Sequence, residues 1–106
     1  GVGGDGSFIG DPFIGPTAPS YGTTGPASSV RYFSGGGGAS NQGSVPSQRG
    51  SGGAGGGGQG AAGGPGGSAP SSDGTANTGG GSGGRYGCSH PGAGGSGIVM
   101  IRYKFQ

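Results

Sequence analysis

Large hydrophobic side chains are sparse in this sequence and gather toward its two ends. From residue 98 onward they alternate with Met, Arg and Lys, and the alternating series is Val99, Ile101, Tyr103 and Phe105. A period of two is typical of a β-strand with one buried face, and β-branched and aromatic residues favour such strands. The pattern therefore predicts a C-terminal strand over about 98–105.

The first 33 residues contain short apolar pairs that Gly, Asp and Pro interrupt. Residues 8–9 and 13–14 are both Phe-Ile, and residues 30–33 read Val-Arg-Tyr-Phe. Short apolar pairs between such breakers predict very short strands or turns. No segment has an apolar period of 3.6 residues, so we predict a mostly non-regular fold with no α-helix.

Between residues 34 and 97 the pattern changes to glycine with a period of three. Over 51–67, two of every three positions are Gly or Ala, and larger side chains such as Gln59 and Pro65 fall in the remaining series. A polyproline II helix has three residues per turn, so this spacing leaves two faces as bare backbone. Neighbouring segments can then approach closely and form backbone hydrogen bonds.

We therefore predict a glycine-rich bundle of polyproline II helices with a few short β-strands. Its longest run is expected over 51–67, with shorter runs over 79–87 and 91–97. The Pro and Ser clusters around Pro46 and Pro70 are expected to form the turns. This interpretation divides one structural unit into 1–33 (short strands and turns), 34–97 (the polyproline II region) and 98–106 (the C-terminal strand).

Composition leaves little material for an ordinary hydrophobic core. Of 106 residues 36 are Gly, hydrophobic residues make up 25%, and the chain contains no Trp and no Leu. Disorder is the alternative, because chains rich in Gly, Ser and Pro usually cannot offset the conformational entropy lost on folding. If the chain is ordered, backbone hydrogen bonds and other subunits must supply what side-chain burial cannot.

Charge and motifs argue against several classes of function. A formal net charge of +2 with scattered cations does not indicate nucleic-acid binding, and no apolar run approaches the roughly 20 residues of a membrane span. The Gly-x-Gly-x-x-Gly matches lack the strand and helix of a nucleotide site. Cys88 and His90 fall short of the four ligands of structural zinc. We predict no enzyme activity, no cofactor and no metal.

Aromatic and charged residues near 85–90 are the candidates for surface binding. Arg85, Tyr86 and His90 lie in a glycine-flanked segment, where an aromatic ring can stack on a sugar; the alternative is a plain turn. Tyr32 and Phe33 are expected to fill a small core against Ile101 and Tyr103. The same apolar set, together with Val99 and Phe105, is the candidate for packing or assembly.

Two segments near the C-terminus resemble a known family. Residues 73–81 read DGTANTGGG and residues 92–103 read GAGGSGIVMIRY, which is similar to the end of the glycine-rich domain of bacteriophage tail-fibre and other virion structural proteins. Met100 stands where that pattern has an aliphatic residue. The resemblance covers 73–103, whereas residues 1–72 agree in composition only.

The resemblance implies a virion fibre or adhesive appendage, with packed polyproline II runs and exposed turns at a tip. It implies a homo-oligomer at the virion surface or outside the cell, trimeric in a fibre tip, that binds a host glycan or protein. A subunit of an extracellular filament with open helical symmetry is the alternative. An ice-binding protein is a third hypothesis, against which the lack of a regular Thr-rich face counts.

Overall fold

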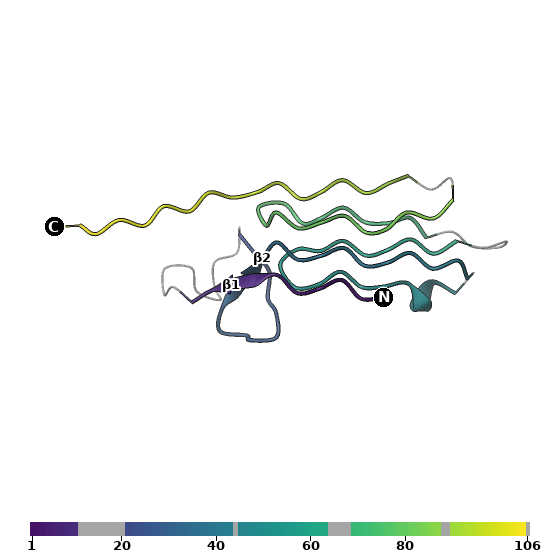
Figure 1. The fold of residues 1–106 in the computed structure, drawn as a ribbon, viewed down its shortest axis with the longest axis horizontal. Coiled ribbons are helices and arrows are strands. Elements are labelled where there is room, and N and C mark those ends of the chain that lie inside the picture. The colour runs from purple at the N-terminus through teal and green to yellow at the C-terminus, as the bar shows by residue number, and fades with distance from the viewer. Residues whose placement is uncertain (11–20, 44, 64–68, 88–89, 106) are drawn as a thin grey trace.

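The computed structural model describes residues 1–10, 21–43, 45–63, 69–87 and 90–105. The molecule is elongated, with extents of 63 × 22 × 18 Å, because extended runs lie side by side and the C-terminal segment projects beyond them (Figure 1). The regular elements in the described residues are β1 (Ser7–Ile9), β2 (Arg31–Phe33) and the 3-10 helix η2 (Pro46–Gln48). The prediction of a mostly non-regular chain without α-helix is confirmed for this part of the chain.

In the described part of the chain, seven extended runs form the bundle, and successive runs point in opposite directions (Figure 1). They are run 1 (1–6), run 2 (34–41), run 3 (49–53), run 4 (57–63), run 5 (69–75), run 6 (80–86) and run 7 (90–97). Hydrogen bonds between runs recur every three residues. The N–H groups of Gly35, Gly38 and Asn41 in run 2 donate to the carbonyls of residues 55, 58 and 61, which lie in run 4 and in the reversal just before it and are also three residues apart.

The hydrogen bonds define two layers. Runs 1, 2, 6 and 7 are bonded in that order within one layer. Run 3 is bonded to runs 1 and 2, run 4 to runs 2 and 6, and run 5 to runs 6 and 7. Each run of the second layer therefore lies over the groove between two runs of the first, which is triangular packing. Backbone hydrogen bonds hold this bundle together where an ordinary domain uses side-chain burial.

Glycine is needed at many of the positions where one run faces another, although buried Ala61 and Ala62 show that some of these positions hold a methyl group. A Cβ atom on Gly60 of run 4 would lie 2.0 Å from the carbonyl oxygen of Ala39 in run 2, and one on Gly53 would lie 2.0 Å from the carbonyl oxygen of Gly4. Such distances are far inside van der Waals contact, so any larger residue would push the runs apart.

The expected long run over 51–67 is wrong, because the chain reverses at residues 54–56 and divides this segment between runs 3 and 4. Gly55 and Gly56 have φ of 98° and 88°, which glycine adopts without steric cost. The turn expected near Pro46 is confirmed by η2. Pro70 lies within run 5 instead of a turn, since its fixed φ also suits an extended segment.

A small cluster of larger side chains lies where β1 pairs with β2. The strands are antiparallel, with Phe8 opposite Tyr32, and the centroids of these two rings are 5.6 Å apart. Tyr32 and Phe33 are each only 7% exposed. Buried Arg31 donates from Nη2 to the carbonyl of Gly22 at 2.6 Å and from Nε to that of Tyr21 at 2.9 Å, which ties the preceding loop to β2. Of the strands or turns predicted at 8–9 and 30–33, both are strands, β1 and β2; 13–14 lies outside the described residues.

The C-terminal segment is extended but forms no strand in the described chain, which corrects the prediction for 98–105. Its side chains Val99, Ile101, Tyr103 and Phe105 are 86%, 84%, 79% and 89% exposed. The expected packing of Tyr32 and Phe33 against Ile101 and Tyr103 is therefore wrong. The segment leaves the bundle after Gly97 (Figure 1), and a strand requires a neighbour to pair its backbone groups.

Candidate binding surface at the end of the bundle

Three chain reversals meet at one end of the bundle, opposite the end from which the C-terminal segment projects (Figure 1). They connect runs 2 and 3, runs 4 and 5, and runs 6 and 7. We call this the reversal end; its described residues are 41–43, 45–49, 69–71, 85–87 and 90. It includes all three residues that the sequence nominates for surface binding.

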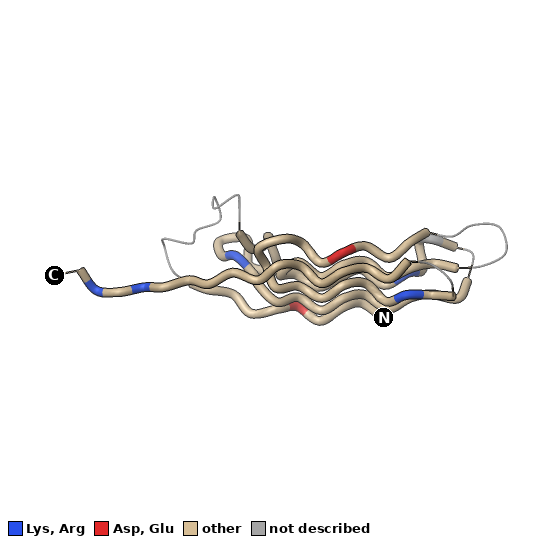
Figure 2. Tube along the Cα trace, turned by 90° about the horizontal axis from the view of Figure 1, so that it is seen from above, with Lys and Arg blue, Asp and Glu red and all other residues tan. Residues whose placement is uncertain are grey.

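The reversal end is cationic. Arg49 and Arg85 are its charged residues, and the described acidic residues, Asp5 and Asp73, lie along runs 1 and 5. Figure 2 shows Lys and Arg near both ends of the molecule and the acidic positions between them. An anionic group approaching this end along the axis of the bundle therefore meets positive charge first.

Arg85 and Tyr86 are the last two residues of run 6, and they differ in exposure. Arg85 is exposed, and its Nε donates to the carbonyl of Gly87 at 2.8 Å, so the guanidinium is held beside the turn that Gly87 forms with φ of 58°. Tyr86 is half-buried, since its ring lies over Gly63: a Cβ there would be 1.8 Å from Cδ1 of the ring. The absence of a side chain at Gly63 thus leaves the space that the ring of Tyr86 occupies.

His90 begins run 7 and is exposed. Its backbone carbonyl accepts a hydrogen bond from Ser71 Oγ at 3.1 Å, and Ser71 Oγ in turn accepts one from the N–H of Gly92 at 3.1 Å. Ser71 therefore fixes the first residues of run 7 to run 5. The backbone of His90 is held while its imidazole faces solvent.

Arg49 is a member of this surface that the sequence analysis missed. Its Nη1 lies 3.5 Å from the carbonyl oxygen of Pro70, and its Nε is buried without a hydrogen-bond partner. Nearby, Asn41 Nδ2 donates to Gln48 Oε1 at 3.2 Å. The available signal was the break in glycine register at 45–49, which places larger polar residues at a turn.

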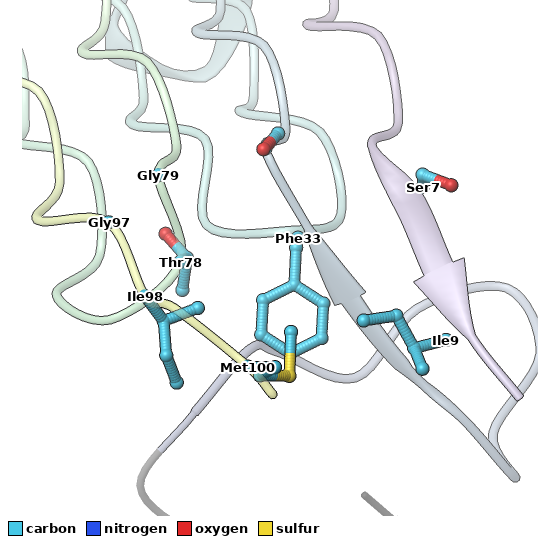
Figure 3. A pocket seen from close by; sticks show the side chains of 9 residues that line it. Ser7, Ile9, Phe33, Thr78, Gly79, Gly97, Ile98 and Met100 are labelled. Carbon is cyan, nitrogen blue, oxygen red and sulfur yellow. The ribbon is translucent and has the colours of Figure 1, made fainter. Parts of the chain in front are cut away.

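The other end of the bundle contains a cavity of about 390 Å³ where the C-terminal segment leaves run 7. Figure 3 shows the side chains of Phe33, Ile98 and Met100 around it, with Ile9 on the far side. Phe33 therefore shares this cavity with Ile98 and Met100, in place of the expected Ile101 and Tyr103. The cavity belongs to the small apolar cluster that joins β1 and β2 to the C-terminal segment.

The chemistry of the reversal end suits binding. Arginine offers planar N–H donors to carboxylate, phosphate or hydroxyl groups, and a fixed aromatic ring offers a stacking surface. The described residues contain no cluster of three or more His, Cys, Asp or Glu that could hold a metal; Cys88 lies outside them. No helix in the described part of the chain is long and apolar enough to cross a membrane.

No protein-family model, curated protein or solved structure matches this chain. Function is therefore inferred from the chain's own residues and geometry.

Proposed function

We propose that this chain is a non-enzymatic structural domain of a virion appendage, a tail-fibre or fibre-tip segment that presents its reversal end to a host surface. The observation that supports this best is the separation of two unlike ends. A projecting extended segment with exposed apolar side chains, and with Arg102 and Lys104 between them, leaves one end of the bundle, whereas the turns that hold Arg49, Arg85 and Tyr86 occupy the other. Attachment to an assembly at one end and display at the other is what an attachment appendage requires.

We further infer that the seven runs are polyproline II helices. The support is the recurrence of inter-run donors at every third residue, as at Gly35, Gly38 and Asn41, because this helix has three residues per turn and no internal hydrogen bonds. Its N–H and C=O groups can then pair only with other segments, chiefly the neighbouring runs. A bundle tied in this way is stiff, and it holds the reversal end at a fixed distance from the attachment point.

Binding would combine weak contacts at the reversal end. Arg49 and Arg85 donate to anionic or hydroxyl groups of a surface glycan or protein, while the ring of Tyr86 stacks on an apolar face of a sugar. His90 adds a donor or acceptor beside them. Such contacts are individually weak, so attachment requires several copies of the chain acting together.

The C-terminal segment is the proposed site of assembly. Its exposed apolar residues, Val99, Ile101, Tyr103 and Phe105, would be covered by the same segment of other copies, in a trimer if the chain forms a fibre tip. The same exposure favours a second function, a subunit of an extracellular filament. There the exposed extended segment would contact the next subunit head to tail, in open helical symmetry.

Electron microscopy of the native assembly tests the proposal first. Discrete trimeric tips on virus particles are expected; long filaments without particles would exclude attachment and favour the filament. A binding assay of the full chain on host cells or a glycan array follows. We expect the R85A/Y86A double substitution to reduce retention at least about tenfold, since a guanidinium and a stacked ring are lost.

The matched control is Lys104→Ala, which removes a cation from the opposite end of the molecule. This variant should bind like the unmodified chain if the reversal end makes the contact. Equal loss of binding in Lys104→Ala and R85A/Y86A would show nonspecific charge attraction, and unchanged binding in both would place the receptor contact elsewhere.

A further inference from the structure

The two layers of the bundle differ in the residues that point outward. In runs 1, 2, 6 and 7 the outward positions are almost all glycine, and we call them the glycine face: Gly1, Gly4, Gly36, Ala39, Gly81, Gly84 and Gly94. In the other layer, exposed or half-buried positions such as Ser51, Gln59 and Asp73 have larger side chains. One surface of the molecule is therefore mostly bare backbone, although Val2, Ala39 and Pro91 in the same runs are also exposed, and the opposite surface is decorated with larger side chains.

Steric need explains the glycines of the decorated layer. A Cβ on any described glycine of runs 3, 4 and 5 would lie within 2.3 Å of another atom, as at Gly52, 1.9 Å from the carbonyl oxygen of Gly57. The glycine face is different. Gly4 has no atom within 4 Å of its ideal Cβ, and for Gly94 the nearest is 3.8 Å away.

The inner positions of the glycine face are intermediate. For Gly36, Gly81 and Gly84 the nearest atoms lie at 3.1, 3.3 and 3.0 Å, and all belong to runs of the same layer. None of these glycines has positive φ. Ala39 occupies the same row, so the row accepts a side chain. Glycine loses more conformational freedom on folding than any other residue, so its use at these positions requires another cause.

Unpaired backbone groups lie on the same face. Among the described residues, none accepts a hydrogen bond from the N–H of Gly4, Gly37 or Ser40. Their nitrogens are the atoms nearest to the Cβ positions of the outward glycines 36, 81 and 84, which places them at this surface. Run 2 contacts four other runs, whereas a run inside triangular packing has six neighbours. The two neighbours that run 2 lacks would both lie against the glycine face.

We propose that the glycine face is the interface with a second copy of this chain. A partner must approach to backbone distance, which the glycine face of another copy permits, and it must offer acceptors to these N–H groups. Among the described residues, no backbone N–H donates to the carbonyls of Gly37 and Ser40, which are also three residues apart. A two-fold rotation makes such a contact self-complementary. Stacking stops at two copies, because the outward side chains of runs 3, 4 and 5 hold any further backbone away.

The size of the face fits a weak but specific contact. The molecule is 22 Å across, and runs of this length extend roughly 22 Å at about 3.1 Å per residue. Two such faces bury on the order of 1,000 Å² together, which is at the lower limit for a specific interface. The interface lies along the side of the bundle, so it does not depend on what the reversal end binds, and it goes beyond the proposed function.

Sedimentation of the full chain over a range of concentrations tests the proposal. The perturbing variant is Gly4→Gln with Gly94→Gln, since both positions have space for a side chain in a single copy. The control is Ser51→Gln with Thr75→Gln, which adds two equal side chains at exposed positions of the other layer. We expect the glycine-face variant to have half the associated mass of the unmodified chain, with its dissociation constant raised at least about tenfold and its melting temperature unchanged at low concentration.

Hydrogen exchange at single residues provides a second readout. The amides of Gly37 and Ser40 should exchange slowly in concentrated unmodified protein and fast on dilution or in the glycine-face variant. If mass and exchange of the unmodified chain do not change with concentration, or if the variant associates like the control, the proposal is overturned. Protection that appears only in the native appendage with other proteins would assign the face to a different partner and also overturn it.

Discussion

Gly60→Ala tests whether backbone contact between runs holds the bundle together. The added Cβ would lie 2.0 Å from the carbonyl oxygen of Ala39, so runs 2 and 4 must separate by about 1.4 Å to reach an ordinary contact of about 3.4 Å. That movement would stretch the hydrogen bond from Gly38 to Gly58 from 2.9 Å to about 4.3 Å, beyond any useful length. The neighbouring bond from Asn41 to Ala61 would be lost with it.

The expected cost of Gly60→Ala follows from these two effects. Two lost hydrogen bonds contribute about 2 kcal/mol, and residual overpacking adds about 1–3 kcal/mol. A total of about 3–5 kcal/mol is a large part of the about 5–15 kcal/mol that stabilises a typical domain. At about 4–8 °C per kcal/mol for a chain of this size, the melting temperature should fall by at least about 12 °C.

Thermal unfolding followed by circular dichroism measures this effect in dilute solution. Gly97→Ala is the matched control, because its Cβ would meet no atom within 4 Å; we expect it to be neutral or to stabilise by up to about 1 kcal/mol. If Gly60→Ala melts at the same temperature as Gly97→Ala, the runs are not packed at backbone distance and the reasoning fails.

Two further substitutions test single side chains that hold loops and turns. Thr78→Val should lower the free energy of unfolding by about 2 kcal/mol, because Oγ1 of this buried residue donates to the carbonyl of Thr75 at 2.6 Å and accepts from the N–H of Gly80 at 2.9 Å. Denaturant unfolding measures this loss, with Thr78→Ser as the control that keeps the hydroxyl. An equal loss of stability in both variants would contradict the role of these hydrogen bonds. Arg31→Met should speed amide exchange at Thr23 and Tyr32 and leave run 4 unchanged, since the bonds to the loop carbonyls are lost; uniform acceleration throughout the chain would instead indicate global destabilisation.

The period of three could be interpreted from sequence because each run requires glycine on the sides that face its neighbours. The reversal at 54–56 could not be predicted, since glycine is found both in an extended run and at positive φ. A glycine-rich sequence therefore looks the same whether the chain continues or turns back. The C-terminal alternation identifies two unlike faces of an extended segment. It does not say whether a neighbour exists to pair with the backbone, so the strand over 98–105 was predicted wrongly.

The candidate surface was predictable only where its residues are adjacent in sequence. Arg85, Tyr86 and His90 are close together in the chain and stand out from the surrounding glycine. Arg49 joins them through a reversal that brings run 3 near Pro70 of run 5, 21 residues further along the chain. Contacts of that kind depend on which runs become neighbours in the bundle. Because the runs are nearly identical in sequence, their neighbours cannot be predicted from the sequence.

The scarcity of buried apolar side chains has a consequence for behaviour in the cold. The buried hydrophobic residues of the described chain are Tyr32, Phe33, Ala61 and Ala62, so unfolding exposes little apolar surface and much peptide backbone. Apolar exposure raises the heat capacity and polar exposure lowers it, and the two contributions nearly cancel here. The free energy of unfolding of such a bundle therefore changes almost linearly with temperature instead of following a dome. Its folded state gains stability steadily on cooling, where proteins with hydrophobic cores begin to lose it.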